Sequence, residues 1–316
     1  MSTARVALPM PVARRSVLRP LAWIEAKRFA RHPLFLVGFA LALAASGGEY
    51  GPVELDHGFV PAFFVGIFGL VVAARLTAST RRCEAVVDAA PVSETTRTAA
   101  LCAACLVPAA AALVVVVVYQ LALALHDPRP AYVYGVFTTG ERYLILLILP
   151  VIACLGAPLL GVAVGRWLRF PGAALLVAVA LILWGMLAGY LPSQGMDAST
   201  WPARILHMLT PYTAWVDSNS GSGATWVPTV VRSLTGSPAW FAAWTLALCA
   251  LAACAALLHG AERRVRQVVL RASWGAGAVA LTSLTLAVVT GYSVPHDSSS
   301  EGTVVADSRT PLPPQP

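Results

Sequence analysis

Charged residues make up only 12% of this 316-residue chain, about half of the roughly 25% that is usual in a soluble globular domain. Hydrophobic residues make up 58% of it, and the mean hydropathy is +0.72. These values exclude an ordinary soluble domain. A bilayer core about 30 Å thick needs roughly 20 apolar residues per helical span, and the chain supplies such runs repeatedly. The composition predicts an all-α, polytopic membrane protein.

Lysine is almost absent, since Lys27 is the only one and lies outside any glycine-rich turn. The Gly-x-x-x-x-Gly-Lys-Ser/Thr phosphate loop is therefore missing, which excludes ATP hydrolysis of the P-loop kind by this chain itself. His-Glu-x-x-His, Gly-x-Ser-x-Gly and paired-cysteine metal spacings are missing too. Cys102 and Cys105 lie in an apolar run, where thiols act as small hydrophobic groups. We expect no enzymatic activity, no metal and no cofactor.

Asp, Glu, Lys and Arg are also missing from the middle of every apolar run. Proton- and ion-coupled carriers generally place such groups at mid-membrane, so an antiporter that drives itself is disfavoured. If the protein moves a solute, the energy must come from another subunit.

Seven apolar runs predict six to seven transmembrane helices, the first run being short and the seventh the least clear. They cover approximately residues 33–47, 59–78, 98–125, 143–165, 171–191, 239–259 and 272–292. The chain then divides into a basic cytoplasmic lead (1–19), a membrane domain (20–293) with a long outer loop (192–238), and a tail (294–316) that is too polar to fold alone. Within the outer loop, residues 201–210 and 226–234 are expected to form short helices anchored by aromatic side chains.

Arginine is concentrated on one side of these spans. With the N-terminus in the cytoplasm, 17 of the 22 basic residues lie inside and ten of the fifteen acidic residues lie outside. The positive-inside rule therefore predicts a cytoplasmic N-terminus and an extracytoplasmic C-terminus. Contact with anionic inner-leaflet lipid accounts for the net charge of +7, so no nucleic-acid partner is needed. The 21 arginines against one lysine indicate a GC-rich bacterial genome, and hence a bacterial plasma membrane.

A polar insert between the second and third spans predicts a short surface helix. A projection at about 100° per residue separates an apolar face from a charged one. The apolar face holds Cys83, Val86, Val87 and Ala90, and the charged face holds Arg81, Glu84 and Asp88. Pro91 ends this helix because a proline disfavours the α conformation in the residue before it. Ser93 is then placed to cap the next helix, with Glu94 in its first turn.

A second surface helix is predicted before the first span, over residues 20–32, where Pro20 suits the first helical position. Its apolar arc holds Ala22, Trp23, Ala26, Phe29 and Ala30, and its polar arc holds Glu25, Lys27, Arg28, Arg31 and His32. A helix of this kind lies in the plane of the membrane interface. Ile24 falls on the polar arc, so an ordinary basic flank of a span is the alternative.

Both surface helices resemble elements of one family. The step Ala89-Ala90-Pro91-Val92-Ser93, after an arginine-bearing helix with a glutamate, is similar to the cytoplasmic coupling loop of type-2 ATP-binding-cassette (ABC) exporter permeases. Arg31-His32-Pro33, after a basic helix, is similar to the end of their elbow helix. The family generally has six spans, so a seventh span with an outer tail departs from its pattern.

The resemblance implies that residues 79–97 form a coupling loop that docks onto a separate cytoplasmic ATP-binding subunit. It also implies that two permeases, identical or different, act together. The residues that it assigns to docking are Arg81, Arg82, Glu84, Val86, Val87 and Asp88. Those that it assigns to the elbow helix are Trp23, Glu25, Lys27, Arg28 and Arg31.

We therefore expect the permease subunit of an exporter that moves a hydrophobic or amphipathic molecule along apolar faces of the second, third and fifth spans. Gln120, the main polar group of the third span, either touches substrate or bonds to a neighbouring helix. Pro150 and Pro158 indicate either a kinked fourth span that lines a path or only the higher proline content of membrane helices. The alternative from another class is a non-transporting scaffold that anchors cytoplasmic partners, which would not require residues 81–90 to be amphipathic. An enzyme of lipid metabolism would need a His, Asp or Glu cluster at one membrane face, and the sequence has none.

Overall fold

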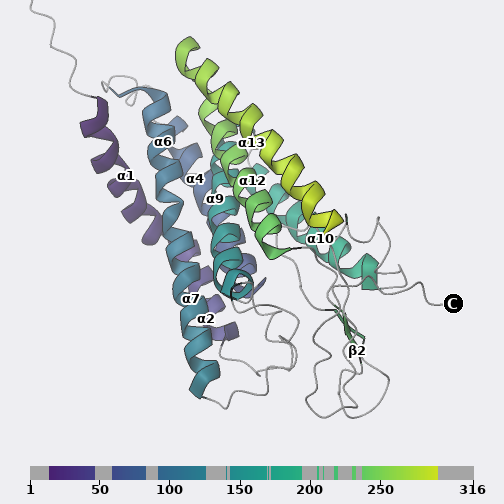
Figure 1. Ribbon diagram of the computed structural model, residues 1–316. Helices are drawn as coiled ribbons and strands as arrows, with labels where there is room; N and C mark the ends of the chain where they lie inside the picture. The colour runs from purple at the N-terminus through teal and green to yellow at the C-terminus, as the bar shows by residue number, and fades with distance from the viewer. Residues whose placement is uncertain are drawn as a thin grey trace, which may run out of the picture.

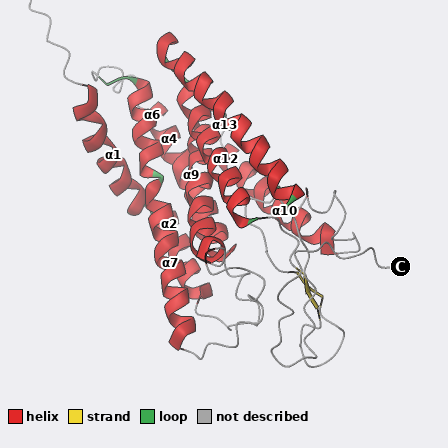
Figure 2. Cartoon of the chain, viewed as in Figure 1, coloured by secondary structure: helices red, strands yellow, loops and turns green. Residues whose placement is uncertain are grey.

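The computed structural model describes residues 14–46, 59–82, 92–125, 140, 143–168, 170, 172–193, 205, 209, 217–219, 230–232 and 237–290. This part of the chain is a bundle of long helices that run roughly side by side (Figure 1). Figure 2 shows that the helices account for nearly all of it, apart from one short pair of strands. The expected all-α class is confirmed at this level.

The helices of the first half are α1 (Arg14–Ala30), α2 (Pro33–Ser46), α3 (Phe59–Pro61), the π-helical turn η2 (Ala62–Gly66), α4 (Ile67–Arg82), α6 (Glu94–Ala104) and α7 (Leu106–Leu125). Those of the second half are the π-helical turn η4 (Leu144–Ile148), α9 (Leu149–Trp167), α10 (Ala173–Ser193), α12 (Pro238–Leu258) and α13 (Arg263–Val289). The strands β1 (Asp217–Asn219) and β2 (Val230–Arg232) pair antiparallel, with Ser218 opposite Val231.

Among the described residues, five helical segments are long and apolar enough to cross a membrane: 62–80, 94–122, 144–167, 238–258 and 263–289. The bent pair of α1 and α2 would make six. The apolar part of α10, Ala173–Ala188, is shorter. A helix therefore occupies each of the seven predicted positions, but only five to six of them suit a full crossing by length and composition.

Prolines explain where the long helices change their winding. A proline supplies no N–H to the carbonyl four residues earlier, and its ring clashes with that carbonyl. Pro108 stands four residues after Ala104, where α6 ends, and a turn at Cys105 separates α6 from α7. Pro150 stands four residues after Leu146, in the middle of η4. The predicted irregularity of the fourth span is thus a π-helical turn at its start, and α9 continues through Pro158.

Helix α4 packs closely against α9 at two glycines one turn apart. A Cβ on Gly161 would overlap the carbonyl of Leu70, and a Cβ on Gly165 would lie 2.9 Å from the carbonyl oxygen of Ala74. Small residues spaced in this way let two membrane helices approach backbone to backbone. The same α9 also packs against α7 and α12, which makes it the central helix of the bundle.

Three predicted boundaries were wrong. The first helix begins at Arg14 and runs through Pro20, so Pro20 is interior and not at the first helical position. The second span continues to Arg82 and not to Ala78. The last helix begins at Arg263, so most of the expected connector at 260–271 is helical. For the second and last spans, apolar length marked only the membrane core, whereas basic and polar residues extend the same helix beyond it.

The outer loop differs from the prediction as well. Residues 226–234 were expected to form a short helix, but Val230–Arg232 form β2. These three residues include two consecutive valines, which favour a strand over an isolated helix. In the other predicted helix only Ile205 and Leu209 are described; they are joined by a helical hydrogen bond of 3.0 Å from the Leu209 N–H to the Ile205 carbonyl. The predicted tail at 294–316 lies outside the described residues.

Candidate functional site

Several helix ends meet at one end of the bundle. Figure 1 shows the start of α6 and the turn from α12 into α13 at the same end, with α1 beside α6. Side-chain contacts bring the ends of α4 and α9 there too. We call it the basic end, because it carries Lys27, Arg28, Arg31, Arg75, Arg97, Arg166, Arg263, Arg264 and Arg266.

Two of the six predicted docking residues are described at this end. Arg81 and Arg82 are the last residues of α4. Glu84, Val86, Val87 and Asp88 lie outside the described residues, so the short surface helix expected there stays a prediction. The described chain resumes at Val92, directly before α6. The end of α4 and the start of α6 are therefore the described elements that flank this segment.

The predicted start of α6 is confirmed. The Ser93 hydroxyl accepts a hydrogen bond of 3.3 Å from the backbone N–H of Thr96, and Ser93 has the extended backbone of a helix cap. Glu94 follows in the first turn, where a carboxylate is favoured by the positive end of the helix dipole.

Glu94 also connects three helices. One Arg166 N–H donates a hydrogen bond of 2.7 Å to Glu94 Oε1, in an ion pair between α6 and the end of α9. The same oxygen lies 3.4 Å from Nδ1 of His259, the residue that follows α12. The Arg166 side chain is only 4% exposed and that of Glu94 is 42% exposed. A buried guanidinium is thus balanced by a carboxylate that reaches toward the surface.

The turn after α12 is shaped to fit this carboxylate. Gly260 has a φ of +74°, which favours glycine, and a Cβ at this position would overlap the Glu94 carboxylate. Trp167 fixes the neighbouring surface, because its indole N–H donates to the carbonyl of Ala255 (2.8 Å). Its ring meets the His259 ring edge to face at 5.6 Å. The ends of α6, α9 and α12 are therefore held together by charge, shape and hydrogen bonding.

The predicted elbow helix, α1, packs against α6 and is tied to α4. Arg28 Nη1 donates to Glu25 at 3.0 Å, and its Nη2 donates to the Ser79 hydroxyl at 3.3 Å, near the end of α4. Burial against the bundle does not follow the two predicted arcs: Glu25, from the polar arc, is 7% exposed, whereas Trp23, from the apolar arc, is 62% exposed. Glu25 can be buried because Arg28 neutralises it.

The outward face of α1 combines aromatic and basic side chains. Lys27, Arg28 and Arg31 are exposed, and the Lys27 ammonium lies 5.1 Å from the centre of the Trp23 ring. An exposed tryptophan beside cationic side chains suits the level of lipid headgroups. The predicted interfacial position of α1 therefore fits its surface, although a different face of the helix is buried.

His32 shapes the 62° bend between α1 and α2. Its Nδ1 accepts a hydrogen bond of 3.3 Å from the backbone N–H of Leu34, which requires this nitrogen to be unprotonated. Burial, and then the charge of Arg75, lower the pKa of His32. Because the folded pKa lies below the unfolded value of about 6.5, this contribution to stability is present above that value and is lost as the pH falls from there through the folded pKa.

Arg28→Met is expected to loosen α1 without unfolding the bundle. Removing Arg28 leaves the Glu25 side chain, which is only 9% exposed, without its counter-charge, so the cost is about 1–3 kcal/mol. Amide hydrogen exchange in residues 21–30 should therefore rise at least about fivefold. Arg31→Met, at an exposed residue of the same end, is the control and should leave this exchange unchanged. Equal effects of both variants would contradict the assigned link.

No sequence pattern indicated that three further residues lie together around Glu94, namely Arg166, His259 and Gly260. Each stands at the end of a predicted span, where arginine is expected from the positive-inside rule and carries no further signal. Nothing local to Glu94 points to a partner 72 residues away. In the described part of the chain, no group of three His, Cys, Asp or Glu residues is arranged to hold a metal ion.

No family model matches the chain, and no curated protein or solved structure matches it.

Proposed function

We propose that this chain is the membrane permease subunit of a type-2 ABC exporter. In this proposal it lies in a bacterial plasma membrane with its N-terminus in the cytoplasm, pairs with a second permease, and moves a hydrophobic or amphipathic molecule. A separate cytoplasmic subunit hydrolyses ATP, and anionic lipid contacts the basic end.

The observation that carries the proposal is the position of Glu94. The predicted coupling segment leads directly into α6, and Glu94 in the first turn of α6 is ion-paired to Arg166 at the end of α9 and lies beside His259 after α12. A partner that pushes this segment would therefore act on several helices together, as interdomain levers do. Arg28 extends the connection by joining α1 to Ser79 near the end of α4.

The scaffold alternative uses the same basic end as a static anchor. It gives no reason why Glu94 should join three membrane helices at the end of a polar insert. The exporter proposal does, because a coupling loop has to transmit motion as well as bind.

The test is co-purification of the intact protein from its native membrane in a mild detergent. We expect an ATP-binding subunit to accompany the wild type, and to be lost from the variant Arg82→Ala/Glu84→Ala/Val87→Asp. The matched control, Arg263→Ala/Arg264→Ala, removes two exposed charges at the same end and should keep the partner. If no ATP-binding subunit accompanies the wild type, the exporter proposal fails and the scaffold becomes the better explanation.

A further inference from the structure

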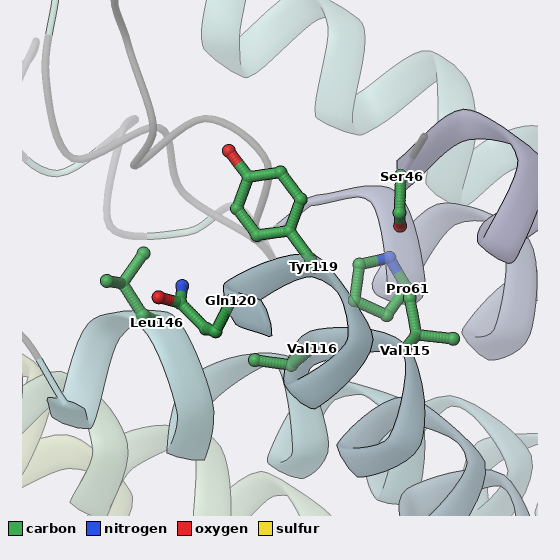
Figure 3. A pocket seen from close by; sticks show the side chains of 7 residues that line it. All are labelled: Ser46, Pro61, Val115, Val116, Tyr119, Gln120 and Leu146. Atoms are coloured by element: carbon green, nitrogen blue, oxygen red, sulfur yellow. The ribbon is translucent and has the colours of Figure 1, made fainter. Parts of the chain in front are cut away.

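A small hollow lies at the end of the bundle opposite the basic end. It is lined by Ser46 at the end of α2, Pro61, Val115, Val116 and Gln120 of α7, and Leu146 of η4, together with the ring of Tyr119 (Figure 3). The enclosed space is small and has room for about one water-sized group, and the remainder is open to the surroundings. Such a hollow admits a single oxygen atom and leaves the rest of a molecule outside.

The walls of the hollow are mostly apolar, but one donor is unused. Gln120 Nε2 is buried and has no hydrogen-bond partner among the residues that the structure describes. Figure 3 shows the Gln120 amide on the side of the hollow nearest Leu146, with Ser46 and Pro61 on the other side. A buried amide without a partner is costly, the more so within a membrane, where water is scarce. The expected bond from Gln120 to a neighbouring helix is therefore not made by this nitrogen.

Both π-helical turns adjoin this hollow. Pro61 immediately precedes η2, and Leu146 lies within η4. Single π-helical turns inside membrane helices are frequent at functional sites, because they widen the helix and re-aim its side chains. Leu146 of η4 lies beside the Gln120 amide, and η2 begins directly after Pro61 in the opposite wall (Figure 3).

The lining also restricts what can bind. None of the lining side chains carries a charge, so an ionised carboxylate or phosphate would be buried without compensation. The Ser46 hydroxyl already donates to the carbonyl of Ala42 at 2.8 Å. The free donor of Gln120 requires an acceptor oxygen, and the walls of Pro61, Val116 and Leu146 require an apolar neighbour to that oxygen.

We infer that this hollow is a binding site for the neutral carbonyl end of an amphipathic ester, held by a hydrogen bond from the Gln120 amide. The carbonyl belongs either to a bilayer lipid or to an apolar ester dissolved in the membrane. This inference does not depend on a partner ATPase, so it stands or falls separately from the exporter proposal.

The experiment uses the full chain in vesicles of ether-linked phosphatidylcholine, which contains no ester carbonyl. Two photoreactive probes are compared, a diazirine-bearing fatty acid methyl ester and a diazirine-bearing alkane of the same length. Labelling of the peptide that contains residues 115–120 is normalised to labelling of the exposed face of α13. The wild type should prefer the ester to the alkane by about fivefold, as one hydrogen bond provides.

Two variants decide the outcome. Gln120→Leu keeps the volume and removes the donor, so the ester should fall to the level of the alkane. Val116→Phe fills the hollow and should reduce labelling by both probes. Its control is Val117→Phe, on the outward side of the same helix. Val117 is 43% exposed, whereas Val116 is 4% exposed, so this control should leave labelling by both probes unchanged. If Val116→Phe does not fold, the Gln120→Leu comparison alone decides.

An ester preference that survives Gln120→Leu, or no preference in the wild type, overturns the inference and leaves a hollow filled by water. Repeating the wild-type experiment in ester-linked phosphatidylcholine identifies the source. Loss of probe labelling there assigns the site to a bilayer lipid, whereas persistence assigns it to a dissolved ester. Both of these results support the inferred site.

Discussion

Gly161→Leu is expected to prevent assembly of the helical bundle. A Cβ at this position would overlap the carbonyl of Leu70 on α4, and a backbone atom cannot rotate away as the end of a side chain can. The larger leucine would separate α4 from α9 along their whole contact, which Gly165 continues one turn later. We expect no monodisperse protein by size-exclusion chromatography in detergent.

Gly161→Ala should show the same effect in measurable form. Overpacking a well-packed interface costs about 1–3 kcal/mol, and the obstacle here is a carbonyl in the helix that α9 packs against. The gain in helix propensity of up to about 1 kcal/mol offsets part of this cost. A lower midpoint of thermal unfolding, followed by circular dichroism in detergent, is the expected result.

Gly275→Ala is the matched control. It makes the same change in α13, where a Cβ would meet nothing within 4 Å, so its helix should be unaffected or slightly more stable. If Gly161→Ala and Gly275→Ala unfold at the same temperature, the close approach of α4 and α9 is not what holds the bundle.

The glycine pair was readable in the sequence, since Gly161-x-x-x-Gly165 stands in an apolar run and small residues four apart favour close helix packing. The pattern does not indicate which helix packs against the two glycines. Leu70 and Ala74 lie on a helix about 90 residues earlier, and many pairings of apolar helices would satisfy composition equally well. The positions of the helices themselves were predictable, because apolar length is a local property.

The cap at Ser93 was predicted for the same reason, since the residues that form it are three apart. A helical projection divides α1 into an apolar arc with Trp23 and a charged arc with Glu25, but it does not say which residues pack against the protein. Glu25 is buried, because Arg28 on the next turn neutralises it and reaches Ser79 on α4. A projection of one helix contains no information about a neighbour of that kind.

Glu94→Ala is expected to destabilise the basic end more than Arg166→Met does. Removing the carboxylate leaves the buried guanidinium of Arg166 without this counter-charge, and a charge left without its partner costs more than the pair contributes. Removing Arg166 instead leaves Glu94, whose side chain is 42% exposed and can be hydrated. Because that exposure screens the pair, we expect about 1–3 kcal/mol for Glu94→Ala and less than half of it for Arg166→Met.

The double variant Glu94→Ala/Arg166→Met should recover part of the loss, since it removes both charges together. Thermal unfolding of the wild type, the two single variants and the double variant gives the coupling between the two side chains. Glu262→Ala is the control, because it removes an exposed acid from the same end of the bundle. It should leave the midpoint nearly unchanged.

Variants of Glu94 also separate a role in stability from a role in transmitting motion between helices. Suppose that Glu94 transmits motion of the preceding segment to α9 and α12. The variant Glu94→Gln keeps the shape of the carboxylate and loses its charge. It should then keep a bound ATP-binding subunit but weaken the stimulation of its ATPase by transported molecules. If the pair is purely structural, its loss lowers the unfolding midpoint and leaves this stimulation intact in the protein that remains folded.

Equal unfolding midpoints for Glu94→Ala and Arg166→Met would contradict the asymmetry expected from burial. The stability of the basic end would then depend more on the turn at Gly260 than on this ion pair.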